Sequence, residues 1–356
     1  MERSKRQSDK GWGILSFDAF LFQSFGGPNN KSDVIQFLEN VTSGRNIPKE
    51  RLETVAQQYY LFGGKSPINE INLDIIKRLE AAFQRNGIQL PIYFGNRNFE
   101  PYVADALARM KADGVKRALC FVTSAYGSFS GCKQYKLDIE NAQKLLGNGA
   151  PEVVKIRHYY SHPGFTNPLV ANSITALRSL PDTKSAHLAF TAHSIPQAMA
   201  DTSPYLEQLH RALDLVVAGI ESQTGQTFPS ALVFQSRSGP PDQAWLEPDV
   251  SDHLARLAMR GTTNVAIVPI SFISEHMEVI YDLDTLAAAK ATELGMSVVR
   301  AKTPSDSPEF IDMIVDLTQE LLDRRKRPAT LGTYSNLNGC TSSCCPAPPR
   351  VAKGTA

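Results

Sequence analysis

The sequence predicts an α/β protein with two Rossmann-like lobes, each a parallel sheet flanked by helices, followed by a disordered C-terminal tail. Short apolar runs that end in small or turn residues alternate with longer segments of helical period, which is typical of parallel strands joined by helices. A chain of 356 residues is too long for one ordinary core and fits two domains of roughly 150 residues plus a tail. We therefore expect a cleft between two lobes.

The first lobe is expected over residues 15–155, because a strand, a turn and a helix recur there three times. The opening apolar run leads into the glycine turn Ser-Phe-Gly-Gly-Pro at 24–28, which ends the strand before a helical segment begins. The expected strands and the helices that follow them are 19–22 with 32–41, 91–94 with 100–112, and 118–123 with 131–146.

The second lobe is expected over residues 156–308, where the same alternation restarts. Its expected strand and helix pairs are 187–192 with 204–220, 231–235 with 250–260, and 265–270 with 275–294. A last helix over 309–327 is predicted to pack back on the first lobe. Residues 328–356 contain few large apolar side chains, so we expect disorder there unless another part of the chain ties them down.

Composition argues against several classes of protein. The 37 basic and 36 acidic residues leave a formal charge of +1, so no nucleic-acid partner is expected. The polar N-terminus lacks the apolar stretch of a signal peptide, and no window has the roughly 18 apolar residues of a membrane span, so no transmembrane segment is expected. Five cysteines in so long a chain fit a reducing compartment better than a disulfide framework, and we expect a cytoplasmic protein.

His193 is the strongest single candidate for a functional side chain. It follows the predicted strand 187–192 and precedes Pro196, which forces the chain out of the sheet at the edge where parallel sheets collect ligands. A lone histidine, however, more often only hydrogen-bonds a loop carbonyl. Its chemistry therefore depends on what lies opposite.

An acidic ridge is predicted on the helix 275–294. Glu275, Glu278 and Asp282 are spaced three and four residues apart, which places their carboxylates on one face of a helix. Like charges at that spacing repel, so the ridge needs either bulk water or a cation. Facing His193, it would offer nitrogen and oxygen ligands suited to Fe²⁺, Zn²⁺ or Co²⁺. From the residues alone, a metal site and a solvated acidic face both stay open.

Two glycine pairs, at 26–27 and 63–64, suit either tight turns or the close approach of a flat ligand to the backbone. Neither pair lies in a dinucleotide-binding or P-loop motif, so nucleotide binding is not supported. Arg45, Lys65 and Arg237 could pair with ligand carboxylates through charge-assisted hydrogen bonds.

Six short motifs occur in a fixed order along the chain. They lie at residues 24–28 (SFGGP), 61–67 (LFGGKSP), 190–196 (FTAHSIP), 234–237 (FQSR), 245–248 (WLEP) and 274–282 (SEHMEVIYD). Together they resemble the ferrochelatase family over roughly residues 15 to 325. The resemblance implies a chelatase-like fold around a porphyrin cleft and a reaction in which Fe²⁺, as substrate, replaces two pyrrole protons. It assigns His193 and Glu278 to the catalytic metal site.

The resemblance also implies which residues contact the porphyrin. Ser66 and Tyr135 match porphyrin-contacting positions of bacterial members, and Tyr59 is expected to join them. Arg45 is the nearest substitute for two arginines that some members carry and this chain lacks. Propionate binding is therefore assigned to Arg45.

The expected substrate is coproporphyrin III, which would give Fe-coproporphyrin (coproheme) in heme biosynthesis. The residues after Ser124 and the cysteine-ended tail resemble actinobacterial members of the family, which generally use coproporphyrin III, and no apolar membrane-facing lip is visible. Alternatives are a protoporphyrin IX ferrochelatase, a cobalt or sirohydrochlorin chelatase, which usually relies on two histidines, and a non-catalytic porphyrin or heme carrier. Asp282 and Glu275 are hypothesised to relay protons or hydrated metal, and other heme-pathway enzymes are candidate partners.

The C-terminal tail carries a cysteine pattern. Cys340, Cys344 and Cys345 resemble the cysteines with which some members of the family bind a [2Fe-2S] cluster. Three thiolates are one short of the usual ligand set, and Cys132 could complete it if the tail reaches that residue. The alternative is a disordered tail with unpaired or oxidised thiols.

Overall fold

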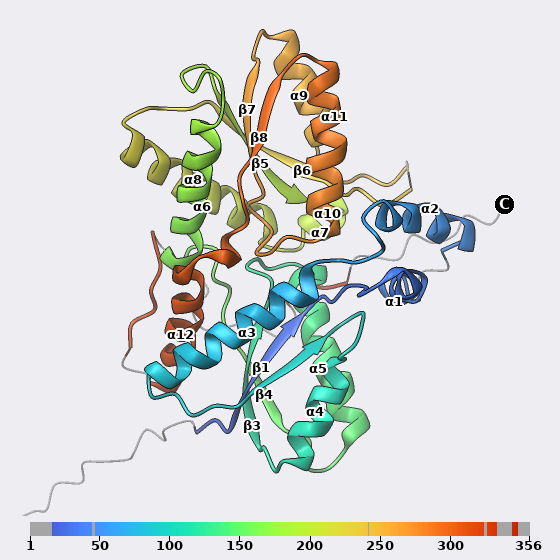
Figure 1. Ribbon diagram of the computed structural model, residues 1–356. Coiled ribbons are helices and arrows are strands. Elements are labelled where there is room, and N and C mark those ends of the chain that lie inside the picture. Colours follow the sequence, from blue (N-terminus) through green and yellow to red (C-terminus); the bar gives the residue numbers. More distant parts are fainter. Residues whose placement is uncertain (1–15, 45–46, 241, 324–325, 333–343, 348–356) are drawn as a thin grey trace, which may run out of the picture.

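The computed structural model describes residues 16–44, 47–240, 242–323, 326–332 and 344–347. Its described strands form two four-stranded sheets, ordered β2-β1-β3-β4 and β6-β5-β7-β8, and every neighbouring pair is parallel. Figure 1 shows one sheet in each of two lobes, with helices on both faces. The predicted fold class is confirmed.

In each sheet the two central strands are buried and the two edge strands are partly exposed. In the first lobe they are β1 (Ala19–Ser24), β2 (Ile92–Asn96), β3 (Arg117–Val122) and β4 (Glu152–Lys155), and in the second β5 (His187–His193), β6 (Ser230–Gln235), β7 (Asn264–Val268) and β8 (Ser297–Arg300). The central strands β1, β3, β5 and β7 are buried over nearly their whole length, as expected for strands covered on both faces. The short edge strands β4 and β8 were not predicted, because they are only partly apolar.

Helices cover the faces of both sheets. Those of the first lobe are α1 (Val34–Val41), α2 (Lys49–Tyr60), α3 (Ile68–Arg85), α4 (Val103–Ala112) and α5 (Gln134–Leu146); those that follow are α6 (Pro163–Arg178), α7 (Gln197–Ala200), α8 (Tyr205–Thr224), α9 (Val250–Met259), α10 (Met277–Val279), α11 (Ala288–Glu293) and α12 (Pro308–Leu322). Two segments, Phe129–Lys133 and Ile280–Ala287, are π-helical. The helix predicted over 275–294 is therefore three consecutive segments.

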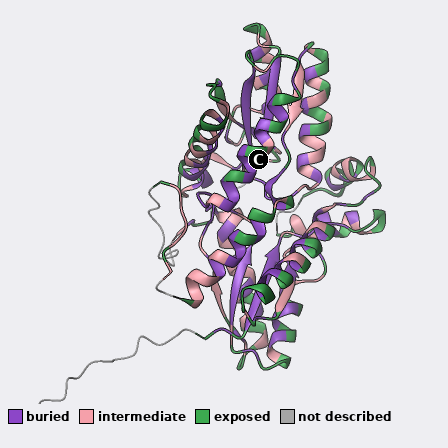
Figure 2. Cartoon of the chain, turned by 60° about the vertical axis from the view of Figure 1, so that its left-hand side comes forward, coloured by how far each residue is buried: buried purple, intermediate pink, exposed green. Residues whose placement is uncertain are grey.

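The largest apolar core runs through both lobes and the contact between them. It joins Phe121 of β3, Phe310 of α12 and Phe190 of β5, and Figure 2 shows buried residues through the centre of the molecule. The ring centroids of Phe121 and Phe310 lie 6.4 Å apart. Helix α12 packs against α6 and α3, so it contacts both lobes. The lobe boundaries given above stay a prediction.

The chain after α12 is tied to the segment that enters the second lobe. Arg157 and Glu320 form an ion pair of 2.8 Å between side chains that are each 7% exposed. Arg157 also donates to the Ala329 carbonyl at 2.8 Å, and the Leu331 amide donates to the Ser161 carbonyl at 2.8 Å. This part of the tail is therefore held by hydrogen bonds. Among the helices of the described ranges, none has both the length and the apolar character needed to span a bilayer.

Candidate metal and porphyrin site

His193 and Glu278 face one another at the carboxyl end of the second sheet. His193 is the last residue of β5, and its Nε2 lies 3.6 Å from Oε2 of Glu278. Their side chains are 34% and 42% exposed, so both can be reached from outside the protein. Nδ1 of His193 lies 2.5 Å from the Ser194 carbonyl, which can only accept, so in the neutral ring Nδ1 carries the proton and Nε2 has a free lone pair.

Glu278 is presented by a short helix that begins abruptly after β7. His276 caps α10, because its Nδ1 accepts the Glu278 amide proton at 3.2 Å. Burial lowers the pKa of His276, which keeps its ring neutral and able to accept that bond. Met277 and Val279 are buried on either side of Glu278, so the carboxylate points away from the core.

Asp282 lies in the π-helical segment that continues from α10. Its carboxylate accepts a hydrogen bond from the Ser236 hydroxyl. Burial raises the pKa of Asp282 to about 6, the bond from Ser236 opposes that rise, and the charge of Glu278 adds to it. Asp282 can therefore take up or release a proton near neutral pH.

Glu275 is a correction to the predicted acidic ridge. It precedes the His276 cap and so does not lie on the helix that carries Glu278. Its carboxylate instead lies 3.1 Å from Arg300 and accepts hydrogen bonds from Thr303, at 3.1 Å from the amide and 3.0 Å from the hydroxyl. The ridge is reduced to two members because the helix starts later than the spacing suggested.

Tyr59 belongs to the first lobe, and its phenol responds to charges of the second. It is near the end of α2, and its ring packs edge-on against Phe37 at 5.8 Å between centroids. Burial raises the pKa of Tyr59, and the negative charges of Glu278 and Asp282 add to that rise. Figure 1 shows α1 and α2 beside the junction of the two lobes.

Ser66 and Tyr135 are both buried in the first lobe, each 4% exposed. A Cβ on Gly27 would come within 2.7 Å of the Ser66 Cβ, so only glycine fits the turn above this serine. The Arg97 guanidinium lies 4.8 Å from the centre of the Tyr135 ring, and burial raises the pKa of Tyr135 to about 12. Neither is seen in contact with the His193–Glu278 pair, and their porphyrin roles stay predictions.

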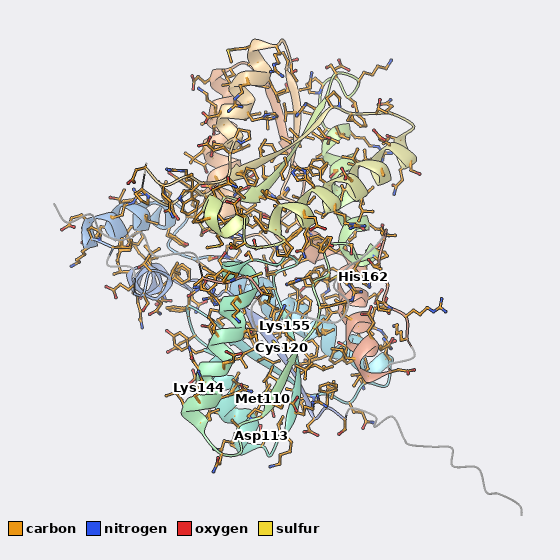
Figure 3. The ribbon with its side chains drawn as sticks, turned by 180° about the vertical axis from the view of Figure 1, so that it is seen from behind. Met110, Asp113, Cys120, Lys144, Lys155 and His162 are labelled. Carbon is orange, nitrogen blue, oxygen red and sulfur yellow. The ribbon has the colours of Figure 1, made fainter. Side chains whose placement is uncertain are left out.

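Two predicted site residues, Arg45 and Cys340, lie outside the described residues. Cys345 is described, and its side chain is buried. Burial raises the pKa of its thiol to about 12, and interactions with Cys344 and Cys132 add to the rise. Cys120 is separate: it is buried in β3 beside Lys155 of β4, as Figure 3 shows.

Ser236 and Gln235 were not assigned roles from the sequence. Both belong to a quoted motif at the end of β6, but their partners come from a helix about 40 residues later, at sequence separations of 43 and 46. Ser236 has a φ of +62°, a left-handed conformation that aims its side chain out of the strand direction. No local sequence pattern predicts that conformation for serine.

The fold and the site together define a two-lobed metal chelatase, with a histidine and a carboxylate facing each other at the carboxyl ends of parallel strands. Residues 18–322 match the sequence model described as Ferrochelatase. The chain belongs to the ferrochelatase family.

Curated relatives match over nearly the whole chain. The coproporphyrin III ferrochelatase of Frankia alni is 45% identical over 345 residues, covering 94% of this chain and 87% of that protein. That of Mycolicibacterium smegmatis is 46% identical over 343 residues, covering 93% and 99%. The ferrochelatase of Rhodopirellula baltica is 44% identical over 344 residues, covering 95% and 97%. The expected resemblance is confirmed.

One solved structure supports the fold alone. SirB from Bacillus subtilis with Fe³⁺ superposes with a TM-score of 0.52 at 10% sequence identity, covering 88% of this chain and 99% of that chain.

Proposed function

We propose that this enzyme inserts Fe²⁺ into coproporphyrin III to give coproheme in heme biosynthesis. The observation that carries the proposal is the 3.6 Å separation between Nε2 of His193 and a carboxylate oxygen of Glu278, at an accessible edge. A neutral nitrogen base and an anionic oxygen are the two groups that metal insertion needs. Relatives named for coproporphyrin III support the substrate.

Insertion replaces two pyrrole protons by Fe²⁺, so the site must both hold the metal and remove protons. The free lone pair of His193 Nε2 can accept a proton or bind the metal, and Glu278 can take the other task. Both groups are half-exposed, so hydrated Fe²⁺ can reach them before it sheds water.

Asp282 is proposed to pass protons outward. Its carboxyl group titrates near pH 6 and is fixed by Ser236, so it can exchange a proton with Glu278 and return it to solvent. The relay role predicted for Glu275 remains a prediction, since its carboxylate is engaged by Arg300 and Thr303.

The porphyrin is proposed to lie between the lobes, over the His193–Glu278 pair. Tyr59 supports this placement, because its pKa responds to charges of the second lobe although it belongs to the first. Ser66, Tyr135 and Arg45 complete the proposed contacts, with Arg45 pairing with a propionate. We also propose a cytoplasmic location, no nucleic-acid partner, and transfer of the product to another heme-pathway enzyme.

One assay tests the proposed substrate. The purified protein is incubated anaerobically with Fe²⁺ and either coproporphyrin III or protoporphyrin IX, and loss of free porphyrin is followed by its absorption. Coproporphyrin III should be consumed faster. Faster consumption of protoporphyrin IX would make that porphyrin the substrate. In a parallel incubation with Co²⁺ and sirohydrochlorin, faster insertion would favour the alternative chelatase. Binding without turnover would indicate a carrier.

We further propose that Cys340, Cys344, Cys345 and Cys132 hold a [2Fe-2S] cluster. The influence of Cys344 and Cys132 on the pKa of Cys345 supports this, and four thiolates are the usual ligand set. Within the described ranges no three histidine, cysteine or acidic side chains converge as ligands, so the proposal requires Cys344 and Cys345 to close on Cys132 when the cluster binds, with Cys340 as the fourth ligand. Such a cluster supplies one-electron redox chemistry when bound.

The cluster has a direct test. Protein purified without oxygen should be brown, contain acid-labile sulfide, and lose both in Cys132→Ser and in Cys344→Ser. Colourless protein without sulfide would reject the cluster. Loss of colour in Cys344→Ser but not in Cys132→Ser would remove Cys132 from the ligand set.

A further inference from the structure

Gln235 connects the strand that carries His193 to the helix that carries Glu278. It is the last residue of β6 and is paired with His193 in the register of β5 and β6. Its carbonyl accepts the Ser194 amide proton at 2.8 Å, which fixes its backbone beside the histidine. Its side-chain Nε2 donates to the Glu278 carbonyl at 3.1 Å. Gln235 is therefore hydrogen-bonded both to the residue that follows His193 and to Glu278 itself.

The acceptor of this bond lies where a helix changes type. Glu278 belongs to α10, and the π-helical segment Ile280–Ala287 begins two residues later. At such a change the backbone carbonyls no longer follow one regular pattern of partners, so a carbonyl there can accept a side-chain donor. Gln235 supplies that donor at the residue whose carboxylate faces the metal.

The surroundings of Gln235 indicate that its amide serves this bond. Gln235 is 1% exposed, and its Oε1 is buried without a hydrogen-bond partner. A buried amide with one unpaired polar atom is destabilising, and methionine of similar volume would fill the same space without that cost. The adjacent Ser236 holds Asp282, so the two residues contact α10 and the π-helical segment that follows it, one point in each.

We propose that Gln235 is a positioning residue that sets the separation of His193 and Glu278 and thereby the affinity for Fe²⁺. The inference rests on the proposed roles of that pair. Groups that orient metal ligands without touching the metal typically change metal affinity or activity by about 10–100-fold when they are removed. The competing explanation is that the buried side chains of Met277 and Val279 alone hold the helix.

Two variants separate these explanations. Gln235→Met removes the donor at nearly constant volume, and Gln235→Asn keeps an amide but is one methylene too short to reach the Glu278 carbonyl. Gln143→Met is the matched control, because Gln143 makes the same kind of bond, from Nε2 to the Pro151 carbonyl at 2.8 Å, on α5 of the other lobe. Each protein is checked for wild-type thermal unfolding before assay.

The measured quantities are kcat/KM for Fe²⁺ and the Kd for coproporphyrin III from fluorescence quenching. Both Gln235 variants should lose about 10–100-fold in kcat/KM for Fe²⁺ with porphyrin Kd unchanged, while Gln143→Met matches the wild type. Equal loss of iron use and porphyrin affinity, or unchanged iron kinetics in a folded Gln235 variant, would overturn the inference. If Gln235→Met does not fold, Gln235→Asn decides by the same criteria. Wild-type turnover in a parallel Glu278→Gln sample would instead defeat the proposed site.

Discussion

Acid stability depends on His162, which is buried neutral against α12. Its side chain is 3% exposed, and Figure 3 shows it beside that helix. Its Nδ1 accepts the Gly164 amide proton at 3.0 Å and caps α6, while Nε2 lies 3.8 Å from Asp316. Burial lowers its pKa from 6.5 to about 4, and the nearby Arg157 charge adds to the decrease.

The direction of the pH effect follows from that lowered pKa. The unfolded chain binds a proton near pH 6.5 and the folded chain only near pH 4, so the stabilisation is complete above pH 6.5 and is lost as the pH falls toward 4. A shift of this size corresponds to about 3 kcal/mol of unfolding free energy. His162→Asn keeps a capping acceptor but cannot titrate. We predict that, between pH 7 and pH 4, the free energy of unfolding of this variant falls by about 3 kcal/mol less than that of the wild type.

Urea unfolding followed by circular dichroism at several pH values measures this difference. His187, whose pKa burial also lowers to about 4, is present in both proteins and cancels in the comparison. A wild-type and variant difference that stays constant to within about 1 kcal/mol across this range would refute the reasoning.

Three further predictions follow from particular contacts. Arg157→Met leaves the buried Glu320 carboxylate without its ion-pair partner and should lower the free energy of unfolding in urea by about 3–5 kcal/mol. The double variant with Glu320→Leu should recover most of that loss, and no recovery would show that the pairing is not the cause. Gly27→Ala should displace Ser66 and weaken coproporphyrin binding by fluorescence quenching, with unchanged affinity arguing against a porphyrin contact there. Asp282→Asn should lose most of the activity, and the kcat that remains should no longer fall below about pH 6. An unaltered kcat–pH profile would exclude the relay.

Much of the fold could be predicted because buried parallel strands show in the sequence as short runs of mostly apolar residues. The strands β1, β3, β5 and β7 are mostly apolar and almost wholly buried, since helices cover both faces. The edge strands β4 and β8 lack such runs, because their partly exposed residues need not be apolar.

The candidate site was predictable only in part. His193 was located because a proline ends its strand, and Glu278 because its spacing suggested a helix. The same spacing misplaced Glu275, because nothing in the charge pattern reveals that His276 caps the helix one residue later. A search for a helical period of 3.6 residues also cannot predict the π-helical segment. The proposed role of Gln235 therefore comes only from its contact with the Glu278 carbonyl.

The central claim is that the carboxylate of Glu278, 3.6 Å from His193, takes part in metal insertion and not in holding the porphyrin. Coproporphyrin III binding and anaerobic Fe²⁺ insertion measured on the same Glu278→Gln sample test it most directly. We predict unchanged porphyrin affinity and a loss of turnover of at least about 100-fold, the scale of a lost acid–base group. Turnover within about tenfold of the wild type, or a matching loss of porphyrin affinity, would contradict the claim.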